Sequence, residues 1–185
     1  MKRLLFICIA IFFIGYFPQT VIADEAKDSI PQDKEQNAYF LVISKQEMNV
    51  SVYDYKSNLV VSYPMACGKN YGNKRKVGDM KTPEGVYKVQ NVHDATLWTH
   101  DFHDGKGVIK GAYGPYFIRL YTPPHTGIGI HGTHDETSIG KRVTEGCIRL
   151  HNSDIKELVE KYIYIKMPVI ITASDKDIQA MYLNE

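Results

Sequence analysis

The chain has 185 residues, of which 44% are hydrophobic and 23% are charged, and its formal net charge is +1. This near-neutral balance gives no electrostatic basis for binding nucleic acid or an anionic membrane surface. Apart from an apolar N-terminal segment, the length suits a single folded domain with one core.

Residues 1–23 have the order of a secretory signal peptide. Two basic residues precede an apolar run over residues 4–17, and the small residues Val21 and Ala23 stand at positions −3 and −1 of a cleavage site. The run is shorter than the roughly 20 residues that cross a bilayer comfortably. We therefore expect export to the periplasm or cell envelope, with an uncleaved segment that anchors the protein to the membrane as the alternative.

Residues 24–37 are charged and polar, and we expect them to form a linker to a domain over residues 38–172. The domain opens with three stretches that are rich in β-branched and aromatic residues and are separated by short polar breaks: residues 39–43, 48–53 and 59–67. This pattern predicts a β-meander.

The middle of the chain alternates between loops and short strands. Residues 68–81 are rich in Gly, Lys and Asn and predict a loop, which ends at a turn and a strand over residues 86–90. Residues 91–115 are aromatic and glycine-rich without a clear period. Further strands are predicted over residues 116–120 and 128–131.

One amphipathic helix is predicted near the C-terminus. Apolar residues keep helical spacing from Ile155 to Tyr162, and Asn152 or Ser153 can cap the first turn. A final strand over residues 168–172 is followed by a polar tail over residues 173–185, for which a helix is an alternative interpretation. The predicted fold class is mainly β with one principal helix.

The cysteines leave two interpretations open. Cys8 lies inside the signal segment, so an exported chain keeps Cys67 and Cys147. An oxidising compartment favours a disulfide between them. The alternative is a reactive thiol at Cys147 and a buried, inert Cys67.

The surroundings of Cys147 favour the reactive thiol. Gly146 permits a sharp bend and close approach of a substrate carbonyl, and the amides of both residues can face an oxyanion. A helix that starts soon afterwards would favour the thiolate. His131 is the candidate base, and Arg149, two residues beyond the cysteine, can hold a carboxylate in the same cleft.

Zinc is the alternative for the same region, because several possible ligands lie close together in sequence: His125, His131, His134, Asp135, Cys147 and His151. The pair His131 and His134 has no matching second pair at familiar ligand spacing. We therefore predict no metal and no cofactor.

Three blocks occur in order along the chain: Lys81-Thr82-Pro83-Glu84-Gly85-Val86-Tyr87, Ile130-His131-Gly132-Thr133 and Gly146-Cys147-Ile148-Arg149-Leu150. A fourth segment, Pro168-Val169-Ile170-Ile171, lies in the closing strand. Together they resemble the L,D-transpeptidase catalytic domain (YkuD-like) family. The resemblance spans about residues 38–172. It implies a β-rich YkuD-like fold and a secreted transferase of peptidoglycan biosynthesis, cell wall organisation and cell shape.

The resemblance also implies roles for single residues. Cys147 is expected to attack the carbonyl of the third residue of a peptidoglycan stem peptide and expel the terminal D-alanine. His131 is expected to activate it, with the backbone carbonyl of Gly132 orienting the imidazole and Arg149 shaping the pocket. Transfer of the thioester to an acceptor amine gives a 3–3 cross-link or an attached protein.

One position departs from the family pattern. The family often has Ser-His before Gly-Cys, whereas this chain has Thr144-Glu145. Glu145 is expected to oppose thiolate formation and to attract an acceptor ammonium. We expect Gly146, Glu145 and His134 to line the substrate pocket and residues 91–115 to form a lid. The alternatives are an L,D-carboxypeptidase that uses water and a catalytically silent wall-binding module.

Overall fold

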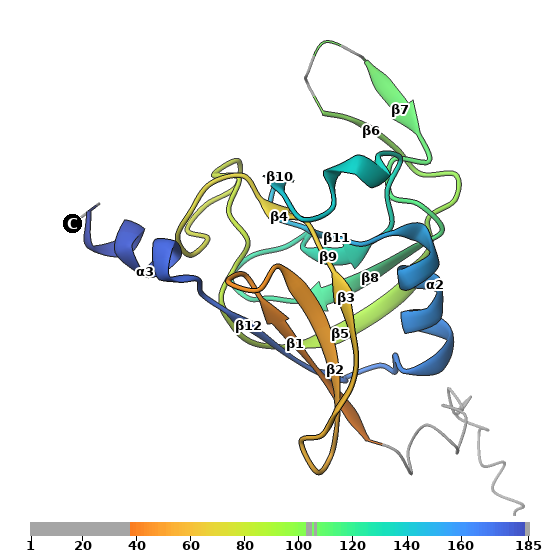
Figure 1. Cartoon of the computed structure of the whole chain (residues 1–185). Helices are drawn as coiled ribbons and strands as arrows, with labels where there is room; N and C mark the ends of the chain where they lie inside the picture. The colour runs from red at the N-terminus through yellow and green to blue at the C-terminus, as the bar shows by residue number, and fades with distance from the viewer. Residues whose placement is uncertain (1–37, 103–104, 106, 184–185) are drawn as a thin grey trace, which may run out of the picture.

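The computed structural model describes residues 38–102, 105 and 107–183, so the predicted signal segment and linker lie outside the described residues. The predicted fold class, mainly β with one principal helix, is confirmed, with a second, shorter helix added (Figure 1). In chain order the elements are β1 (Tyr39–Ser44), β2 (Asn49–Asp54), β3 (Leu59–Pro64), β4 (Cys67–Gly68), β5 (Gly85–Asp94), β6 (Thr99–Asp101), β7 (Val108–Lys110), β8 (Tyr116–Tyr121), β9 (Gly129–His131), a 3-10 turn η1 (Glu136–Ser138), β10 (Arg142–Thr144), β11 (Ile148–Arg149), α2 (Asn152–Lys161), β12 (Pro168–Thr172) and α3 (Asp175–Tyr182).

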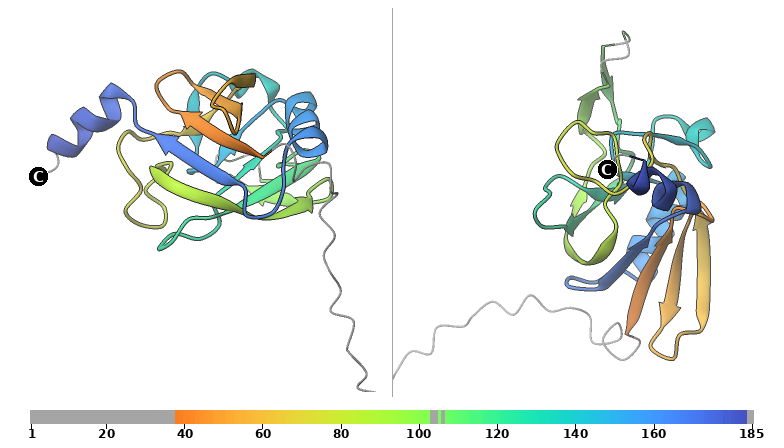
Figure 2. Two further views of the ribbon diagram at one scale, coloured as in Figure 1. Left: turned by 90° about the horizontal axis from the view of Figure 1, so that it is seen from below. Right: turned by 90° about the vertical axis from the view of Figure 1, so that its left-hand side faces the viewer.

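The main sheet has eight strands in the order β11-β9-β8-β5-β12-β1-β2-β3 and curls until its two edges meet (Figures 1 and 2). Ala66, just beyond β3, exchanges two backbone hydrogen bonds of 2.8 and 2.9 Å with Arg149 of β11 at the opposite edge. Because the two edges meet, few backbone N–H and C=O groups at the edges of the described sheet are left unpaired. The closure also brings the N-terminal meander beside the strand that follows Cys147.

The core follows from strand alternation. Leu41 and Ile43 of β1 are fully buried, and they pair in parallel register with Val169 and Ile171 of β12, whose side chains are also buried. Inward-facing apolar residues repeat at every second position along a strand. The first and last strands of the domain are therefore neighbours at the centre of the sheet.

Helix α2 buries Ile155 and Leu158 against this core, as the apolar spacing predicts. Its predicted capping was wrong. The N-cap is His151, which makes no side-chain cap hydrogen bond. The Asn152 side chain instead accepts from the amide of Thr133 at 2.8 Å and donates to its carbonyl at 2.9 Å. Asn152 therefore holds the chain just after His131.

Residues 91–115 contain structure that the sequence pattern does not predict. Strand β5 continues to Asp94, and β6 and β7 pair as a hairpin that projects from the body (Figures 1 and 2). The side chains of these two short strands are exposed or half-buried on both faces. A strand without a buried face has no period-two pattern of apolar residues to detect.

The segment predicted as a polar tail ends in helix α3. Ser174 and Asp177 form a capping box at its start, and Asp177 is 0% exposed. A hydrogen bond of 2.7 Å from the Gly72 amide to Asp177 docks the helix on the loop over residues 69–84. Neither described helix has the length and apolar content needed to cross a membrane.

Candidate active site

Cys147 lies on a tight turn between β10 and β11. Gly146 before it has φ of 132°, and a Cβ at that position would stand 2.6 Å from the carbonyl oxygen of Lys81. Only glycine fits this close approach without strain. The Thr144 hydroxyl donates to the carbonyl of Cys147 at 2.6 Å and accepts from the Gly146 amide at 3.2 Å. The Gly146 amide is thus occupied within the turn, so it does not face a substrate oxyanion in this conformation.

Thr82 holds the Cys147 turn in place through its side-chain hydroxyl. Its side chain is fully buried, and its hydroxyl donates to the Gly146 carbonyl at 2.9 Å while accepting from the Gly68 amide at 2.9 Å. One hydroxyl therefore connects the loop over residues 69–84 to the residue before Cys147. This contact explains why the Thr82-Pro83-Glu84-Gly85 block and the cysteine turn occur together in one chain: the block supplies the hydroxyl that binds the turn.

Replacing Thr82 with valine is expected to lower the free energy of unfolding by about 2 kcal/mol, because the Gly68 amide and the Gly146 carbonyl are left buried without this partner. Thr82→Ser keeps the hydroxyl and serves as the matched control. Urea denaturation measures both variants. A valine variant within about 0.5 kcal/mol of the parent would show that the turn does not depend on this hydroxyl.

His131 ends β9 on the strand next to the cysteine turn. Strands β9 and β11 run parallel, with His131 opposite Arg149 and Ile130 opposite Ile148. The imidazole is 3% exposed, and its Nδ1 donates to the Gly132 carbonyl at 2.6 Å. Because a carbonyl only accepts, this contact places the proton on Nδ1 and leaves Nε2 as an acceptor.

Aromatic rings hold the imidazole from two sides. Phe117 stacks on it with ring centroids 5.6 Å apart and planes 5° apart, and Tyr113 meets it edge-on at 4.9 Å. The absence of a side chain on Gly129 makes room, since a Cβ there would stand 2.4 Å from the Phe117 ring. The neutral imidazole therefore has a defined orientation and little freedom to turn.

Burial lowers the pKa of His131 from 6.5 to about 3, with a smaller contribution from the nearby Arg149 charge and against the effect of the Gly132 carbonyl. The unfolded chain therefore binds a proton at this residue between about pH 6.5 and 3 that the folded protein does not bind. Stability from this group is complete above pH 6.5 and is lost as the pH falls.

Lowering the pH from 7 to 5 is expected to cost about 2 kcal/mol of stability through His131 alone. His131→Gln, which does not titrate in this range, should lose correspondingly less over the same interval. Denaturant titrations at the two pH values measure the difference. Equal losses in the two proteins would show that the imidazole is not held neutral.

The Cys147 thiol is half-buried and donates to the Gly127 carbonyl at 3.4 Å rather than to the imidazole. Burial raises its pKa, the Gly129 amide lowers it and the Glu145 carboxylate raises it, so that the pKa lies above the ordinary value for a thiol. The expectation that a helix N-terminus favours the thiolate form of Cys147 was wrong, because α2 begins only after β11 and two further residues. The resting pair is a neutral thiol and a neutral imidazole.

Sequence reasoning missed the contacts of Gly127 and Gly129 with the thiol. A glycine on each side of Ile128, just before His131, is the signal that indicates close backbone approach at this point.

Arg149 lies beyond Cys147 on β11 and lines a cavity of about 390 Å³ with two other predicted site residues, His134 and Glu145. The guanidinium is 5% exposed, and its Nη1 donates to the Ser138 hydroxyl at 3.0 Å. We call this cavity the Arg149 pocket. Its remaining lining residues are Lys69, Met80, Phe102, Asp135, Thr137, Ser138, Lys141, Val143 and Thr144.

Strand β6 and the residue that follows it, Phe102, cover one side of this pocket. The His100 Nε2 lies 3.2 Å from the Glu145 carboxylate. The Phe102 ring lies 5.6 Å from the Arg149 guanidinium and 5.1 Å from the His134 ring. Residues of the predicted lid thus contact Glu145, Arg149 and His134, although residues 103, 104 and 106 lie outside the described part of the chain.

Cys67 is separate from this site. It is fully buried next to β10, and its sulfur contacts the Met48 sulfur at 3.8 Å. Both described cysteines are free. The disulfide interpretation was therefore wrong, and Cys67 packs as a small apolar residue.

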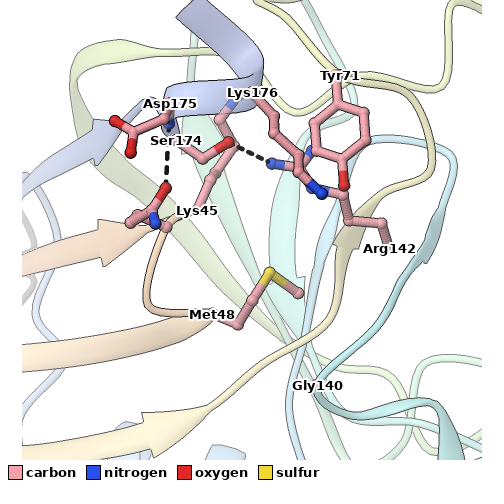
Figure 3. A pocket seen from close by; sticks show the side chains of 9 residues that line it. Lys45, Met48, Tyr71, Gly140, Arg142, Ser174, Asp175 and Lys176 are labelled. Atoms are coloured by element: carbon pink, nitrogen blue, oxygen red, sulfur yellow. Dashed lines mark hydrogen bonds between the residues drawn. The ribbon is translucent and has the colours of Figure 1, made fainter.

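A second cavity of about 440 Å³ lies beside the start of α3 and contains none of the predicted site residues (Figure 3). Lys45 binds Glu84 at 2.5 Å and Asp177 at 3.3 Å, and Arg142 binds Asp177 at 2.6 Å and stacks over Tyr71 at 4.2 Å. The four charges of Lys45, Arg142, Glu84 and Asp177 neutralise one another. The ion pairs beside the cavity join α3, the loop over residues 69–84 and β10.

The zinc alternative lacks a ligand set in the described part of the chain, where no three His, Cys, Asp or Glu side chains converge on a point that suits a metal ion. The candidate ligand His151 pairs instead with Glu136. The ring of His131 is engaged through Nδ1 with a carbonyl. The donors that the sequence groups together are therefore separated by the fold.

Comparison with known proteins identifies relatives of the chain. The sequence model of the L,D-transpeptidase catalytic domain, YkuD, matches residues 38–171. The putative L,D-transpeptidase YkuD of Bacillus licheniformis is 32% identical over 120 residues, which cover 65% of this chain and 58% of that protein. The putative L,D-transpeptidase YqjB of Bacillus subtilis is 41% identical over 143 residues, which cover 76% of this chain and 74% of that protein.

The fold is also similar to solved structures. The helical cell shape determining protein Pgp2 of Campylobacter jejuni superposes with a TM-score of 0.55 at 22% identity, over 76% of this chain and 49% of that one. At this identity the likeness concerns the fold. The chain spans 58% of the Bacillus licheniformis relative and about half of the Campylobacter protein, so the similarity covers part of those proteins rather than their whole length.

Proposed function

Because this chain belongs to the YkuD family of L,D-transpeptidase catalytic domains, we propose that it is an exported cysteine transpeptidase acting on peptidoglycan stem peptides. Residues 1–23 supply the export signal, and residues 38–172 with α3 form the catalytic unit. The product is a 3–3 cross-link or an attached protein, which contributes to cell wall organisation and cell shape.

Cys147 and His131 carry the chemistry. The sulfur attacks the carbonyl carbon of the third stem residue while the thiol proton passes to Nε2 of His131. The C–N bond to the terminal D-alanine then breaks, and its amine leaves with that proton. The acceptor amine attacks the thioester, gives a proton back through the same imidazole and frees the thiol.

The observation that carries this proposal is the arrangement of His131. Its Nδ1 is bound to the Gly132 carbonyl at 2.6 Å, its ring is stacked on Phe117, and its strand pairs directly with the strand that follows Cys147. A backbone carbonyl thus fixes the tautomer, as an aspartate does in other triads. The reaction requires the thiol to exchange its contact with the Gly127 carbonyl for one with Nε2, and catalytic contacts of this kind often form or tighten when substrate binds.

Incubation of the exported form with a disaccharide-tetrapeptide tests the proposal. Mass spectrometry should find free D-alanine and cross-linked dimers. Tripeptides without dimers would indicate water as the acceptor, and hence an L,D-carboxypeptidase. No change in the tetrapeptide, with a protein that still binds cell wall, would identify a catalytically silent wall-binding module.

A further inference from the structure

Arg119 of β8 places a further positive charge on the face of the sheet that carries His131. Strands β8 and β9 pair antiparallel, with Phe117 opposite His131. Arg119 stands two residues further along β8, opposite Gly129. Residues that are paired across two strands, or two positions apart on one strand, point to the same face. The Arg119 side chain therefore projects on the same side of the sheet as the imidazole.

The Arg119 guanidinium contacts the ring that supports the imidazole. Its Cζ lies 5.3 Å from the centroid of Phe117, the ring that stacks on His131 at 5.6 Å. The opposite position on β9, Gly129, has no side chain that could pair with the guanidinium or cover it. A cation over an aromatic face is held in place while its hydrogen-bond donors stay free for another group.

The charge of Arg119 also reaches the nucleophile. Burial raises the pKa of the Cys147 thiol, whereas the charges of Lys74 and Arg119 act in the opposite direction. Lys74 is neutralised by an ion pair with Asp79 at 2.8 Å. In the part of the chain that the structure describes, the half-buried Arg119 guanidinium has neither a hydrogen-bond acceptor nor a carboxylate within ion-pair distance. Its charge is therefore available to an anion that arrives beside the thiol.

The proposed donor brings a carboxylate to this position. The terminal carboxylate of a tetrapeptide is separated from the attacked carbonyl carbon by one nitrogen and one Cα atom, which is a distance of roughly 3–4 Å. A group that binds this carboxylate must lie near the Cys147 sulfur without contacting it. Arg119 meets this condition, since its charge acts on the thiol while the thiol itself donates to the Gly127 carbonyl at 3.4 Å.

We propose that Arg119 binds the terminal carboxylate of the leaving D-alanine and makes the enzyme selective for donors with a free carboxylate at this position. Two parallel N–H groups of the guanidinium receive the two carboxylate oxygens. The contact holds the scissile bond beside the Cys147 sulfur, and the carboxylate departs with the D-alanine amine. This inference rests on the proposed function, since it names how the donor of the same reaction is held.

Two tetrapeptide donors test the proposal on the unmodified enzyme, one with a free terminal carboxylate and one with a terminal amide. The first turnover, followed as release of D-alanine or its amide after rapid quenching, precedes the attack of any acceptor, so a carboxylate of the acceptor does not contribute. We expect acylation at least about tenfold faster with the free carboxylate, since a site built for a polar group rejects ligands that lack it. Equal rates overturn the inference but leave the proposed function intact. Failure to release either product counts against the proposed function itself.

Arg119→Gln assigns the contact to this side chain. We expect at least about a tenfold loss of the acylation rate with the free carboxylate and little loss with the amide, so that the ratio of the two rates falls toward one. Arg119→Lys keeps the charge near the thiol but lacks the planar fork, so it should restore only part of the ratio. An unchanged ratio in Arg119→Gln would refute the assignment. Because both donors are compared on one variant, a change in thiol reactivity or a loss of folded protein cannot imitate the expected result.

Lys88→Gln is the matched control. Lys88 is exposed on the neighbouring strand β5, and its Nζ lies 5.1 Å from the ring centroid of Tyr121, the next aromatic residue along β8 after Phe117. The substitution therefore removes the same charge and the same kind of contact at another position, and it should leave the ratio between the two donors unchanged. A fall equal to that in Arg119→Gln would mean that the enzyme responds to positive charge in general, and would overturn the assignment.

Discussion

Replacing Cys147 with alanine is expected to lower D-alanine release from a tetrapeptide donor by about 10⁴-fold or more. The sulfur is the group that forms the proposed thioester, and no other described thiol reaches the site, because Cys67 is fully buried elsewhere. Steady-state release of D-alanine, followed by chromatography, measures the effect. Thermal unfolding of the same samples shows that the variant is folded.

Cys67→Ala is the matched control for this result. It removes a buried sulfur that touches Met48, so it should cost about 1 kcal/mol of stability and retain most of the turnover. Two outcomes would count against the account. One is substantial turnover by the Cys147 variant, and the other is an equal loss in both variants.

Asp177→Asn is expected to lower the free energy of unfolding by about 3–5 kcal/mol, the largest stability effect that the fold predicts. The carboxylate is 0% exposed and binds both Lys45 and Arg142. The amide would leave Arg142 without its counter-ion and Lys45 with Glu84 alone. It also accepts from the Gly72 amide, so α3 and the loop over residues 69–84 would separate together. Chemical denaturation at pH 7 measures the change.

Asp175→Asn on the same helix is the control, because that side chain is exposed. It should cost less than about 1 kcal/mol through the helix dipole alone. Burial would raise the pKa of Asp177, but hydrogen bonds from Ser174 and from the Gly72 amide and the charge of Lys45 lower it to about 2. Its stabilisation is therefore present above about pH 4 and is lost as the pH falls toward 2. Equal stabilities of the two variants would show that the buried network is not essential.

The parts of the fold that the sequence predicts are those with one buried face. Strands such as β1 and β12 alternate buried and exposed side chains, and α2 keeps Ile155 and Leu158 at helical spacing. The hairpin of β6 and β7 has no buried face and was missed for that reason. Local periodicity reports burial, so it cannot detect strands that project into solvent.

The residues proposed to carry the chemistry could be predicted from the sequence, but the distant residues that contact the site could not. The motif around Cys147 and the histidine at the end of β9 can be found in the sequence because glycines mark close backbone approach. The contact of Glu145 with His100 joins residues 45 positions apart, and Thr82 meets Gly146 across 64 positions. Such pairs depend on how the sheet curls, which no local pattern encodes.

The hydrogen bonds and ion pairs of Asp177 are a stronger example of contacts that no local sequence pattern predicts. Asp177 lies in a segment whose composition predicts a polar tail, yet it accepts from Gly72, 105 positions away. A buried carboxylate and an exposed one have the same sequence signature when their counter-ions come from distant elements. The expectation that the following helix favours a thiolate at Cys147 failed for a related reason, because burial of the thiol depends on tertiary packing rather than on the nearby helix.

Intact-protein mass spectrometry after incubation with a carbapenem tests the central claim, a reactive thiol at Cys147, most directly. Attack of the sulfur on the lactam carbonyl opens the ring and leaves a thioester of defined mass. The account predicts one adduct per chain, located at Cys147 by peptide mapping and missing in Cys147→Ala. A folded protein that forms no adduct, or that carries it on another residue, would contradict the account.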